Sequence, residues 1–257
     1  MHWTPGYDVK VMSDNVDFIN VMTYDMHGSW ERQADHHAPL FKRSWEGGNN
    51  NVDYIINYYI SQGASASKII LGIPLYGRSW TLSSGKTSPP APASGAGAAG
   101  LITKQAGFLG YNEICKSVKS GTYKVVRDAQ QKCGPYAFSS SLWVGYDDVE
   151  TAIVKSKYAL SSGLGGAMVW DISTDDFNNA CGDGKFALCS AISKTLSGNA
   201  PAPGPGPTPA PGPSPTPRPT HAPAPGPTPS PSGPCKNLPL FNRLPLLVSQ
   251  VISVDYS

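Results

Sequence analysis

Three apolar runs that each end in aromatic and charged side chains constrain the fold of this sequence most strongly. The runs are VDFINVMTYD at residues 16–25, KIILGIPLYGR at 68–78 and GGAMVWD at 165–171. Unbroken apolar runs of this length are typical of parallel strands that are covered on both faces. We therefore expect three buried strands that deliver polar groups to a shared edge of one sheet.

Amphipathic helices are predicted to alternate with these strands. Residues 51–62 place apolar side chains at helical spacing, with Asn51 at the start of the helix and Gly63 at its end. Further helices are predicted over 148–161 and 185–196 by the same criteria. Alternation of strands and helices predicts an α/β fold built on a parallel sheet.

An insertion, residues 77–146, interrupts the alternation. It begins with a loop rich in Gly, Ala, Ser and Pro that reaches residue 100, followed by a predicted helix over 111–118 and a strand over 123–127. Roughly seventy residues is well above the length of a connecting loop. We therefore expect a small α+β subdomain.

The C-terminal quarter of the chain has a different composition. Residues 199–234 are mostly Pro with Ala, Gly, Ser and Thr, which predicts a disordered, extended linker that cannot form a core. Residues 235–257 are too short for a domain, and their apolar stretch, 244–254, is too short to cross a membrane. We expect a remnant tail there.

Charge and motifs exclude several functions. The formal net charge is +2 and no basic run is present, so nothing indicates a nucleic acid partner. No G-x-G-x-x-G follows a strand and there is no P-loop, so no nucleotide cofactor is predicted. Asp35, His36 and His37 lie together in a polar stretch, but adjacent histidines point in different directions. We expect a solvated loop rather than a metal site.

The cysteines indicate an oxidising compartment. Five are present, with no CxxC pair and no histidine at zinc-ligand spacing, so disulfides are favoured over a metal. Residues 1–20 nevertheless show none of the features of a secretory signal peptide. We therefore expect the natural N-terminus to lie upstream.

The strand ends carry the candidate site. Ligands of α/β proteins bind at the carboxyl ends of the strands. Aromatic rings stack on flat apolar faces while Asp and Arg supply directed hydrogen bonds, and a pyranose ring offers both kinds of surface, so a carbohydrate is the favoured ligand. The alternative is that the aromatic residues only cap a core. The residues at these ends are Thr23, Tyr24, Asp25, Tyr76, Arg78, Trp170 and Asp171.

Five blocks of the sequence resemble animal chitinases of glycoside hydrolase family 18. They are VMTYDMHGSWE at 21–31, ILGIPLYGRSW at 70–80, AGFLGYNEIC at 106–115, WVGYDD at 143–148 and GGAMVWDISTDDF at 165–177. They occur in family order and cover about residues 5–196. The resemblance implies that residues 1–198 are the C-terminal part of a catalytic domain. That part is a partial (β/α)8 TIM barrel containing strands six to eight, with the α+β insertion after the seventh.

The family resemblance also implies a chemistry. In the family's substrate-assisted retaining mechanism, a Glu protonates the glycosidic oxygen while the substrate's 2-acetamido carbonyl attacks the anomeric carbon. The implied partner is chitin or a chitooligosaccharide, and no cofactor is implied. Tyr24 would hold the acetamide oxygen and Asp25 would lie beside the acid. Glu113 would either reach the cleft or occupy a solvated helix position. The remaining implied sugar contacts are Met22, Thr23, Tyr76, Arg78 and Trp170.

The sequence departs from the family at the catalytic acid. The family carries its acid in a DxxDxDxE motif, which occurs nowhere in this sequence. The acidic clusters at 147–150 and 171–176 do not have its spacing. We therefore expect a fragment that is inactive and marginally stable alone, whose full-length parent is an extracellular chitinase. The alternative is a lectin-like protein that binds chitooligosaccharide without cleaving it.

The resemblance also suggests how the cysteines pair. It implies a Cys115–Cys181 disulfide and, as the remaining pair of the catalytic region, Cys133–Cys189. Cys235 is left over, and it is interpreted as the first cysteine of a truncated chitin-binding module.

Overall fold

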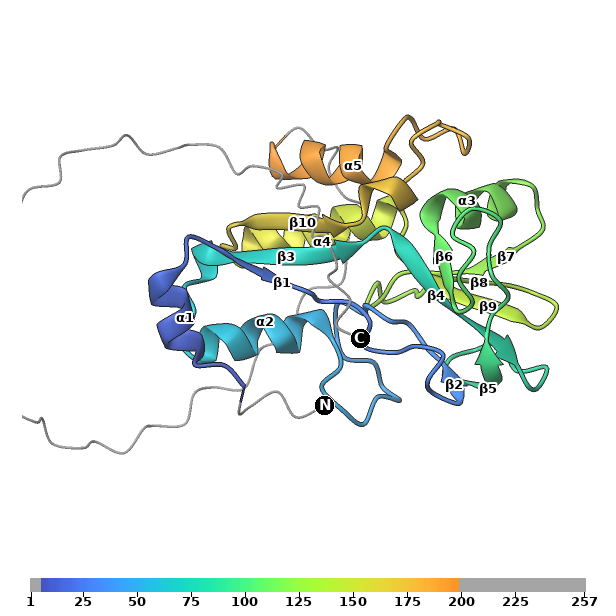
Figure 1. Cartoon of the computed structure of the whole chain (residues 1–257), viewed down its shortest axis with the longest axis horizontal. Helices are drawn as coiled ribbons and strands as arrows, with labels where there is room; N and C mark the ends of the chain where they lie inside the picture. The colour runs from blue at the N-terminus through green and yellow to red at the C-terminus, as the bar shows by residue number, and fades with distance from the viewer. Residues whose placement is uncertain (1–5, 199–257) are drawn as a thin grey trace, which may run out of the picture.

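A parallel sheet forms one half of the molecule in the computed structural model, which describes residues 6–198 (Figure 1). Its strands are β1 (Ile19–Val21), β3 (Ile69–Pro74) and β10 (Gly166–Trp170), in the order β1-β3-β10. On β3, Ile70 pairs with Asn20 on one side and with Gly166 on the other. The sheet is therefore parallel, as the sequence predicts. The predicted linker and tail lie outside the described residues.

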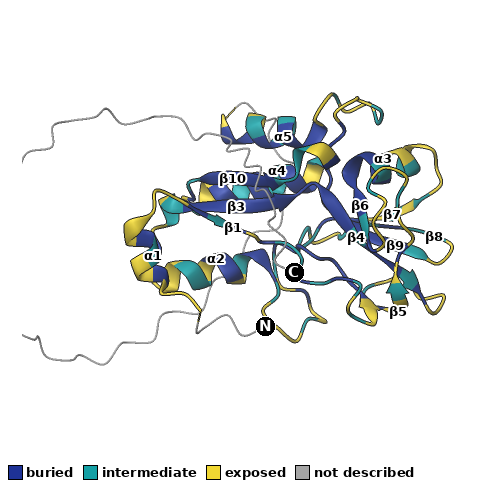
Figure 2. Cartoon of the chain, in the orientation of Figure 1, coloured by how far each residue is buried: buried dark blue, intermediate teal, exposed yellow. Residues whose placement is uncertain are grey.

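The central strand β3 is buried along its whole length (Figure 2). A Cβ atom on Gly72 would lie 2.5 Å from the carbonyl oxygen of Val21, so glycine allows the chain leaving β1 to approach β3 closely. Thr23 uses this approach, since its Oγ1 donates to the carbonyl oxygen of Gly72 at 2.7 Å. The end of β1 is thereby fixed against β3.

The predicted helices form next to this sheet. In α2 (Val52–Ser61) the side chain of Asn51 accepts a hydrogen bond from the amide of Tyr54, and in α4 (Val149–Ser161) Asp148 caps Thr151 in the same way. Each cap satisfies one of the backbone amides that a helix leaves unpaired at its start. Helix α5 (Ala187–Leu196) packs against α4.

Another helix and two short 3-10 helices complete this half. Helix α1 (Val9–Asn15), which Asp8 caps, precedes β1. The 3-10 helices are η1 (Ala66–Lys68) before β3 and η2 (Ile172–Thr174) after β10.

The insertion contains the helix predicted over 111–118, as α3 (Tyr111–Lys119), and the strand predicted over 123–127, as β7, but these belong to a larger antiparallel sheet. The order of this sheet is β2-β5-β4-β9-β8-β7, in which β2 comes from the chain before α2, and β6 pairs with β4. The Gly, Ala, Ser and Pro-rich stretch that was predicted to be a loop contains β5, because it pairs with β4 and β2. The strands are β2 (Gln33–Ala34), β4 (Tyr76–Leu82), β5 (Ala91–Ala96), β6 (Phe108–Gly110), β7 (Lys124–Val126), β8 (Tyr136–Ser139) and β9 (Leu142–Tyr146).

This antiparallel sheet has an aromatic core of its own. Trp80 on β4 and Trp143 on β9 are fully buried and meet edge to face, with ring centroids 5.5 Å apart. Tyr136 stacks on Trp143 at 5.2 Å. Aromatic contacts of this kind stabilise a sheet beyond the area they bury, so the insertion packs as a subdomain.

The polar stretch predicted to be a solvated loop is instead buried. We call residues 35–43 the buried polar segment, because Asp35, His36, His37 and Arg43 are each at most 6% exposed. His36 and His37 lie side by side with their rings nearly parallel, and their ring nitrogens reach the backbone oxygens of two different strands. The expectation of solvation was wrong because these groups find partners on β4 and β9.

The cysteine pairing agrees with the resemblance at one pair only. Cys115 on α3 (Tyr111–Lys119) is joined to Cys181, which connects the insertion to the segment after β10. The Cys133–Cys189 pair is wrong, since both are free thiols in the described part of the chain. Cys133 lies beside Asp128 in the loop before β8, whereas the amide of Cys189, on α5, donates to Asp175.

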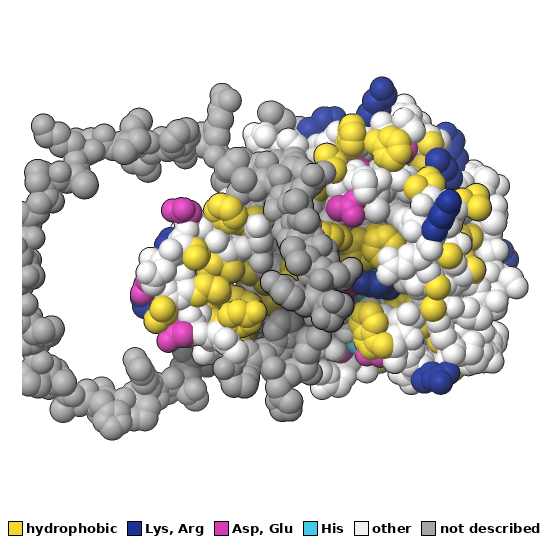
Figure 3. Space-filling model, in the orientation of Figure 1, with side chains coloured by type: hydrophobic (Ala, Val, Ile, Leu, Met, Phe, Trp, Pro, Cys, Tyr) yellow, Lys and Arg dark blue, Asp and Glu magenta, His cyan; other side chains and the backbone are white. Residues whose placement is uncertain are grey.

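Apolar side chains remain exposed beside β1. Val16, Phe18 and Met22 are between 37% and 67% exposed, and the space-filling view shows hydrophobic side chains gathered over α1, β1 and α2 (Figure 3). Among residues 6–198, no helix has the length and apolar character needed to cross a membrane.

Candidate functional site

The candidate site lies at the carboxyl ends of the parallel strands, where the sheet meets the insertion (Figure 1). Tyr24 and Asp25 follow β1, Trp170 ends β10, and Tyr76 and Arg78 lie on β4. Only Leu75 separates β3 from β4, so these two side chains also stand at the end of β3. The sequence prediction that three strands finish at one edge agrees with this arrangement.

Asp25 is the centre of a hydrogen-bonded cluster. Its Oδ1 accepts hydrogen bonds from Tyr76 Oη and Arg78 Nε, both at 2.7 Å, and its Oδ2 accepts one from Arg78 Nη2 at 2.7 Å. A two-point contact between a guanidinium and a carboxylate fixes both direction and distance. The Asp25 side chain is still 35% exposed, so a ligand can reach it.

These contacts keep Asp25 ionised. Burial alone would raise the pKa of the carboxyl, but the two-point contact from Arg78 and the hydrogen bond from Tyr76 outweigh it. The pKa of Asp25 therefore lies well below its usual range. At neutral pH the site presents a carboxylate that can only accept hydrogen bonds.

Tyr24 beside it stays a neutral phenol. Burial, reinforced by the charge of Asp25, raises the pKa of Tyr24. Its ring meets the ring of Tyr76 edge to face at 6.1 Å, and its hydroxyl lies 4.0 Å from the sulfur of Met168 on β10. Tyr24 therefore holds a hydrogen-bond donor between the ends of the strands, suited to a carbonyl oxygen.

Two aromatic residues that sequence reasoning missed extend the cluster. The guanidinium carbon of Arg78 lies 5.5 Å from the ring centroids of Trp30, Tyr76 and Phe108. Phe108 also stacks on Tyr76 at 4.4 Å, and Trp30 is 62% exposed. Cation–π contacts hold such rings against the arginine. The sequence feature that could have identified Trp30 is its position in VMTYDMHGSWE at 21–31, one of the blocks that resemble chitinases.

The other predicted residues differ in accessibility. Met22 is exposed, and Trp170 is half-buried at the end of β10, where its backbone oxygen accepts a hydrogen bond from the amide of Leu75 at 2.8 Å. Thr23 is fully buried and its hydroxyl is used by Gly72. Met22 and Trp170 can therefore meet a ligand, whereas Thr23 supports the strand.

Glu113 is half-buried in the first turn of α3, where its carboxylate has partners in the protein. Its carboxylate accepts hydrogen bonds from the amide of Gly110 at 3.2 Å, the amide of Ile102 at 2.6 Å and Thr103 Oγ1 at 2.7 Å. It caps α3 and holds the preceding loop. These contacts give the carboxylate of Glu113 a structural role, and its contact with a ligand stays a prediction.

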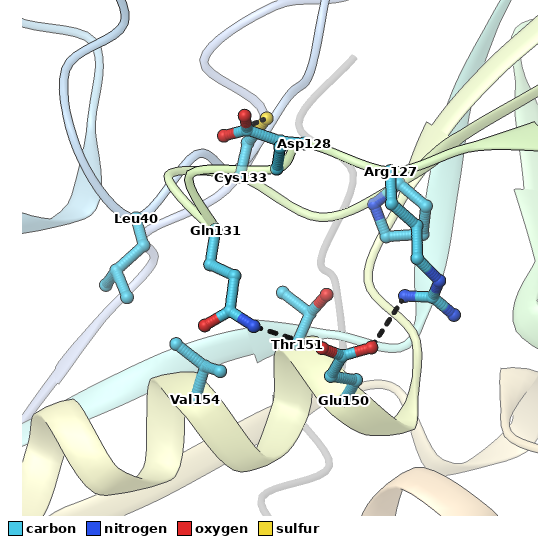
Figure 4. A pocket seen from close by; sticks show the side chains of 10 residues that line it. Leu40, Arg127, Asp128, Gln131, Cys133, Glu150, Thr151 and Val154 are labelled. Atoms are coloured by element: carbon cyan, nitrogen blue, oxygen red, sulfur yellow. Dashed lines mark hydrogen bonds and ion pairs between the residues drawn. The ribbon is translucent and has the colours of Figure 1, made fainter. Parts of the chain in front are cut away.

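Two other features resemble ligand sites. Cys115, Asp176 and Cys181 have metal-ligand spacing, but the disulfide joins the two sulfurs, so neither is a thiolate that could bind a metal. A cavity of about 230 Å³ lies between α4 and the loop before β8 (Figure 4). There Glu150 accepts hydrogen bonds from Gln131 and pairs with Arg127, so its polar groups already have partners.

Known proteins resemble this chain over most of its described length. Residues 1–175 match the family "Glycosyl hydrolases family 18". Human Chitinase-3-like protein 2 is 41% identical over 197 residues, which cover 74% of this chain and 50% of that protein.

Two solved structures show the same likeness in three dimensions. Catalytic domain 2 of the Ostrinia furnacalis Group II chitinase has a TM-score of 0.74 and 39% identity, covering 77% of this chain and 52% of that one. Human YKL-39, described as a pseudo-chitinase with retained chitooligosaccharide binding properties, has a TM-score of 0.70 and 42% identity, covering 74% and 53%. This chain spans about half the length of these relatives.

Proposed function

The chain belongs to glycosyl hydrolase family 18, and on that basis we propose that its strand-end cluster binds the N-acetylglucosamine units of chitin or chitooligosaccharides. The observation that carries the proposal is Asp25, held as a carboxylate by Tyr76 and Arg78 beside the neutral hydroxyl of Tyr24. An acceptor and a donor at one edge match the N–H and the carbonyl oxygen of an acetamide group.

Each side chain then has a chemical role. Tyr24 donates to the acetamide oxygen, and Asp25 accepts from the acetamide N–H, which turns the carbonyl oxygen towards the anomeric carbon. Trp170 stacks on the apolar face of the sugar, while Met22 lines the pocket and Arg78, with Trp30, contacts flanking units. These roles position the acetamide for the attack that substrate-assisted retention requires.

Cleavage also needs a general acid, and this sequence does not contain the motif in which the family carries that acid. Departure of the glycosidic oxygen requires a general acid, and the sequence contains no DxxDxDxE motif. We assign hydrolysis to a longer, secreted parent in which β1, β3 and β10 are strands six to eight of a (β/α)8 barrel. The parallel sheet, the insertion after β3 and the Cys115–Cys181 disulfide support this assignment.

A second candidate is a lectin-like protein that binds chitooligosaccharide without cleaving it. The likeness to human YKL-39 favours it, because that protein is described as a pseudo-chitinase that retains binding. The likeness to the Ostrinia furnacalis chitinase is equally good and favours an enzyme. The two candidates share the binding cluster and differ only in the acid.

Calorimetric titration of the 257-residue chain with chitotetraose tests the binding. We expect saturable binding that Trp170→Ala and Asp25→Asn each weaken about tenfold or more, which corresponds to about 1.4 kcal/mol. Tyr7→Ala is the matched control, since Tyr7 is 72% exposed before α1, outside the strand-end cluster. Absence of binding, or equal effects of all three changes, would contradict the proposal.

A hydrolysis assay tests whether catalytic activity belongs to this chain or only to its longer parent. We expect no release of fluorophore from a fluorogenic chitobioside by this chain alone. Measured turnover that Asp25→Asn abolishes would show that an acid outside the family motif is present, and it would overturn the assignment of hydrolysis to the parent.

A further inference from the structure

His37 joins the two chain segments that carry the cluster. Its imidazole is fully buried, with Nδ1 3.4 Å from the amide nitrogen of Asp25 and Nε2 3.2 Å from the backbone oxygen of Tyr76. Its own backbone oxygen accepts a hydrogen bond from the amide of Met26 at 2.9 Å. His37 therefore contacts both partners of the Tyr76–Asp25 hydrogen bond.

One neutral tautomer satisfies both ring contacts. A carbonyl oxygen can only accept a hydrogen bond, so Nε2 is protonated and donates to the backbone oxygen of Tyr76. A backbone amide can only donate, so Nδ1 is unprotonated and accepts from the amide of Asp25. Nδ1 also lies 3.6 Å from Oδ1 of Asp25, which is too long for a hydrogen bond. Burial lowers the pKa of His37, and the charge of Asp25 opposes this without reversing it, so the ring is neutral at physiological pH.

The neighbouring histidine makes the same pair of contacts with other partners. Nε2 of His36 lies 2.9 Å from the backbone oxygen of Tyr146, and its Nδ1 accepts the amide of Ala38 at 3.3 Å. His36 thus anchors the buried polar segment to β9, whereas His37 anchors it to β4 and to the end of β1. This makes His36 a matched control for His37.

We propose that His37 is the positioning residue of the sugar-binding cluster, holding the backbone of Asp25 so that its carboxylate meets Tyr76 and Arg78. Asp25 has φ +60°, a left-handed conformation that is uncommon for residues other than glycine. The hydrogen bond to Nδ1 gives the Asp25 amide a partner in that conformation. Without it, the conformation would be less favoured and the carboxylate would lose its direction. This inference rests on the function proposed above.

Two substitutions separate the contacts of His37. In His37→Asn the amide oxygen lies near the position of Nδ1 and can accept from Asp25, but the side chain is too short to reach Tyr76. In His37→Gln the side chain reaches the position of Nε2 and can donate to Tyr76, but it offers Asp25 no acceptor. We expect His37→Asn to keep the chitotetraose affinity within about threefold and His37→Gln to weaken it about tenfold or more. Equal affinities of the two variants would overturn the inference.

A measurement without ligand keeps this test independent of the proposed function. Hydrogen exchange of the Asp25 amide, followed by NMR on the full chain, should be slow in the wild type, in His37→Asn and in the control His36→Gln. It should be fast in His37→Gln. If the wild type binds no chitotetraose while exchange follows this pattern, the proposed function fails and the positioning role stands. If exchange in His37→Gln is as slow as in the wild type, the positioning role fails.

The tautomer of His37 gives a third readout that needs no variant. Nitrogen NMR of chain carrying labelled histidine should show His37 protonated at Nε2 and unprotonated at Nδ1. This result decides the matter even if His37→Gln does not fold, because a proton on Nδ1 would exclude the hydrogen bond from Asp25 and overturn the inference.

Discussion

Strand β3 and the polar side chains Asp35, His36, His37 and Arg43 of the buried polar segment are all hidden from solvent, but different forces hold them. All six residues of β3 are buried, and their side chains are apolar. In the buried polar segment, Asp35 pairs with Arg43, and Lys155 donates to the backbone oxygen of Ala38 while it pairs with Asp147. Burial of a charged group is tolerated only when partners replace the water that it loses.

Substitutions in the two regions should therefore lower the free energy of unfolding by different amounts and for different reasons. An apolar strand loses stability roughly in proportion to the volume removed from it. A buried ion pair loses far more when one partner is removed, because the other charge is left without compensation. Four substitutions test this contrast.

Lys155→Met should be the most damaging change. It nearly conserves volume but leaves Asp147 buried without its cation, and both side chains are 0% exposed. We expect a loss of about 3–5 kcal/mol in the free energy of unfolding, measured with urea. Adding Asp147→Leu should recover much of that loss, because an apolar pair needs no compensation. A loss below about 1 kcal/mol for Lys155→Met would break the comparison.

Asp25→Asn removes a partly exposed charge that is held by Tyr76 and Arg78 on β4. Because the folded state lowers the pKa of Asp25, the carboxylate stabilises the fold above its unfolded pKa of about 4, and this contribution disappears as pH falls through the folded value. At pH 7 we expect a loss of about 1–2 kcal/mol, discounted for the exposed third of the side chain.

The sign of the pH effect provides the check on Asp25→Asn. The difference in stability between wild type and variant should begin to shrink as pH falls below about 4, where the carboxyl of the unfolded wild type takes up a proton, and it should vanish only as pH falls through the lower folded pKa. Urea titrations at several pH values measure it. A difference that stays constant from pH 7 to the acid limit would mean that the charge of Asp25 contributes nothing.

Ile73→Val removes one methylene from the centre of β3. Ile73 is 0% exposed, so the change leaves a small cavity and should cost about 0.5–1.5 kcal/mol. Thermal unfolding followed by circular dichroism measures it. A cost as large as that of Lys155→Met would show that the sheet tolerates disturbance no better than the buried charges do.

Asp14→Asn tests whether the large contribution of the Lys155–Asp147 pair to stability comes from its burial or from charge pairing itself. Asp14 pairs with Lys10 at 2.6 Å on α1, and the two side chains are 57% and 62% exposed. An exposed pair one helical turn apart contributes about 0.3–0.5 kcal/mol, and added salt should remove it. A cost above about 1 kcal/mol would mean that pairing matters more than burial.

Sequence patterns predicted the elements whose signals are local. The three apolar runs gave the parallel strands, and Asn51 and Asp148 marked the starts of α2 and α4 because a cap needs only a side chain three residues from the amide it binds. Placing Asp25, Tyr76 and Arg78 at strand ends was enough to predict that they meet, because parallel strands end at one edge.

Whether a polar residue is buried depends on the tertiary structure, since the partners of these residues are distant in the sequence. Lys155 lies 117 residues from the backbone oxygen that it binds at Ala38, and His36 lies 110 residues from its partner Tyr146. The spacing of residues along the sequence does not indicate such distant partners. The sequence therefore predicted that His37 is solvated and that Thr23 contacts a ligand. Local sequence patterns predict which strands form and where they end, because apolar burial follows a repeating pattern. Only the packing of the insertion against the parallel sheet decided which polar groups are buried and which face a ligand, because each buried polar group needs a specific partner.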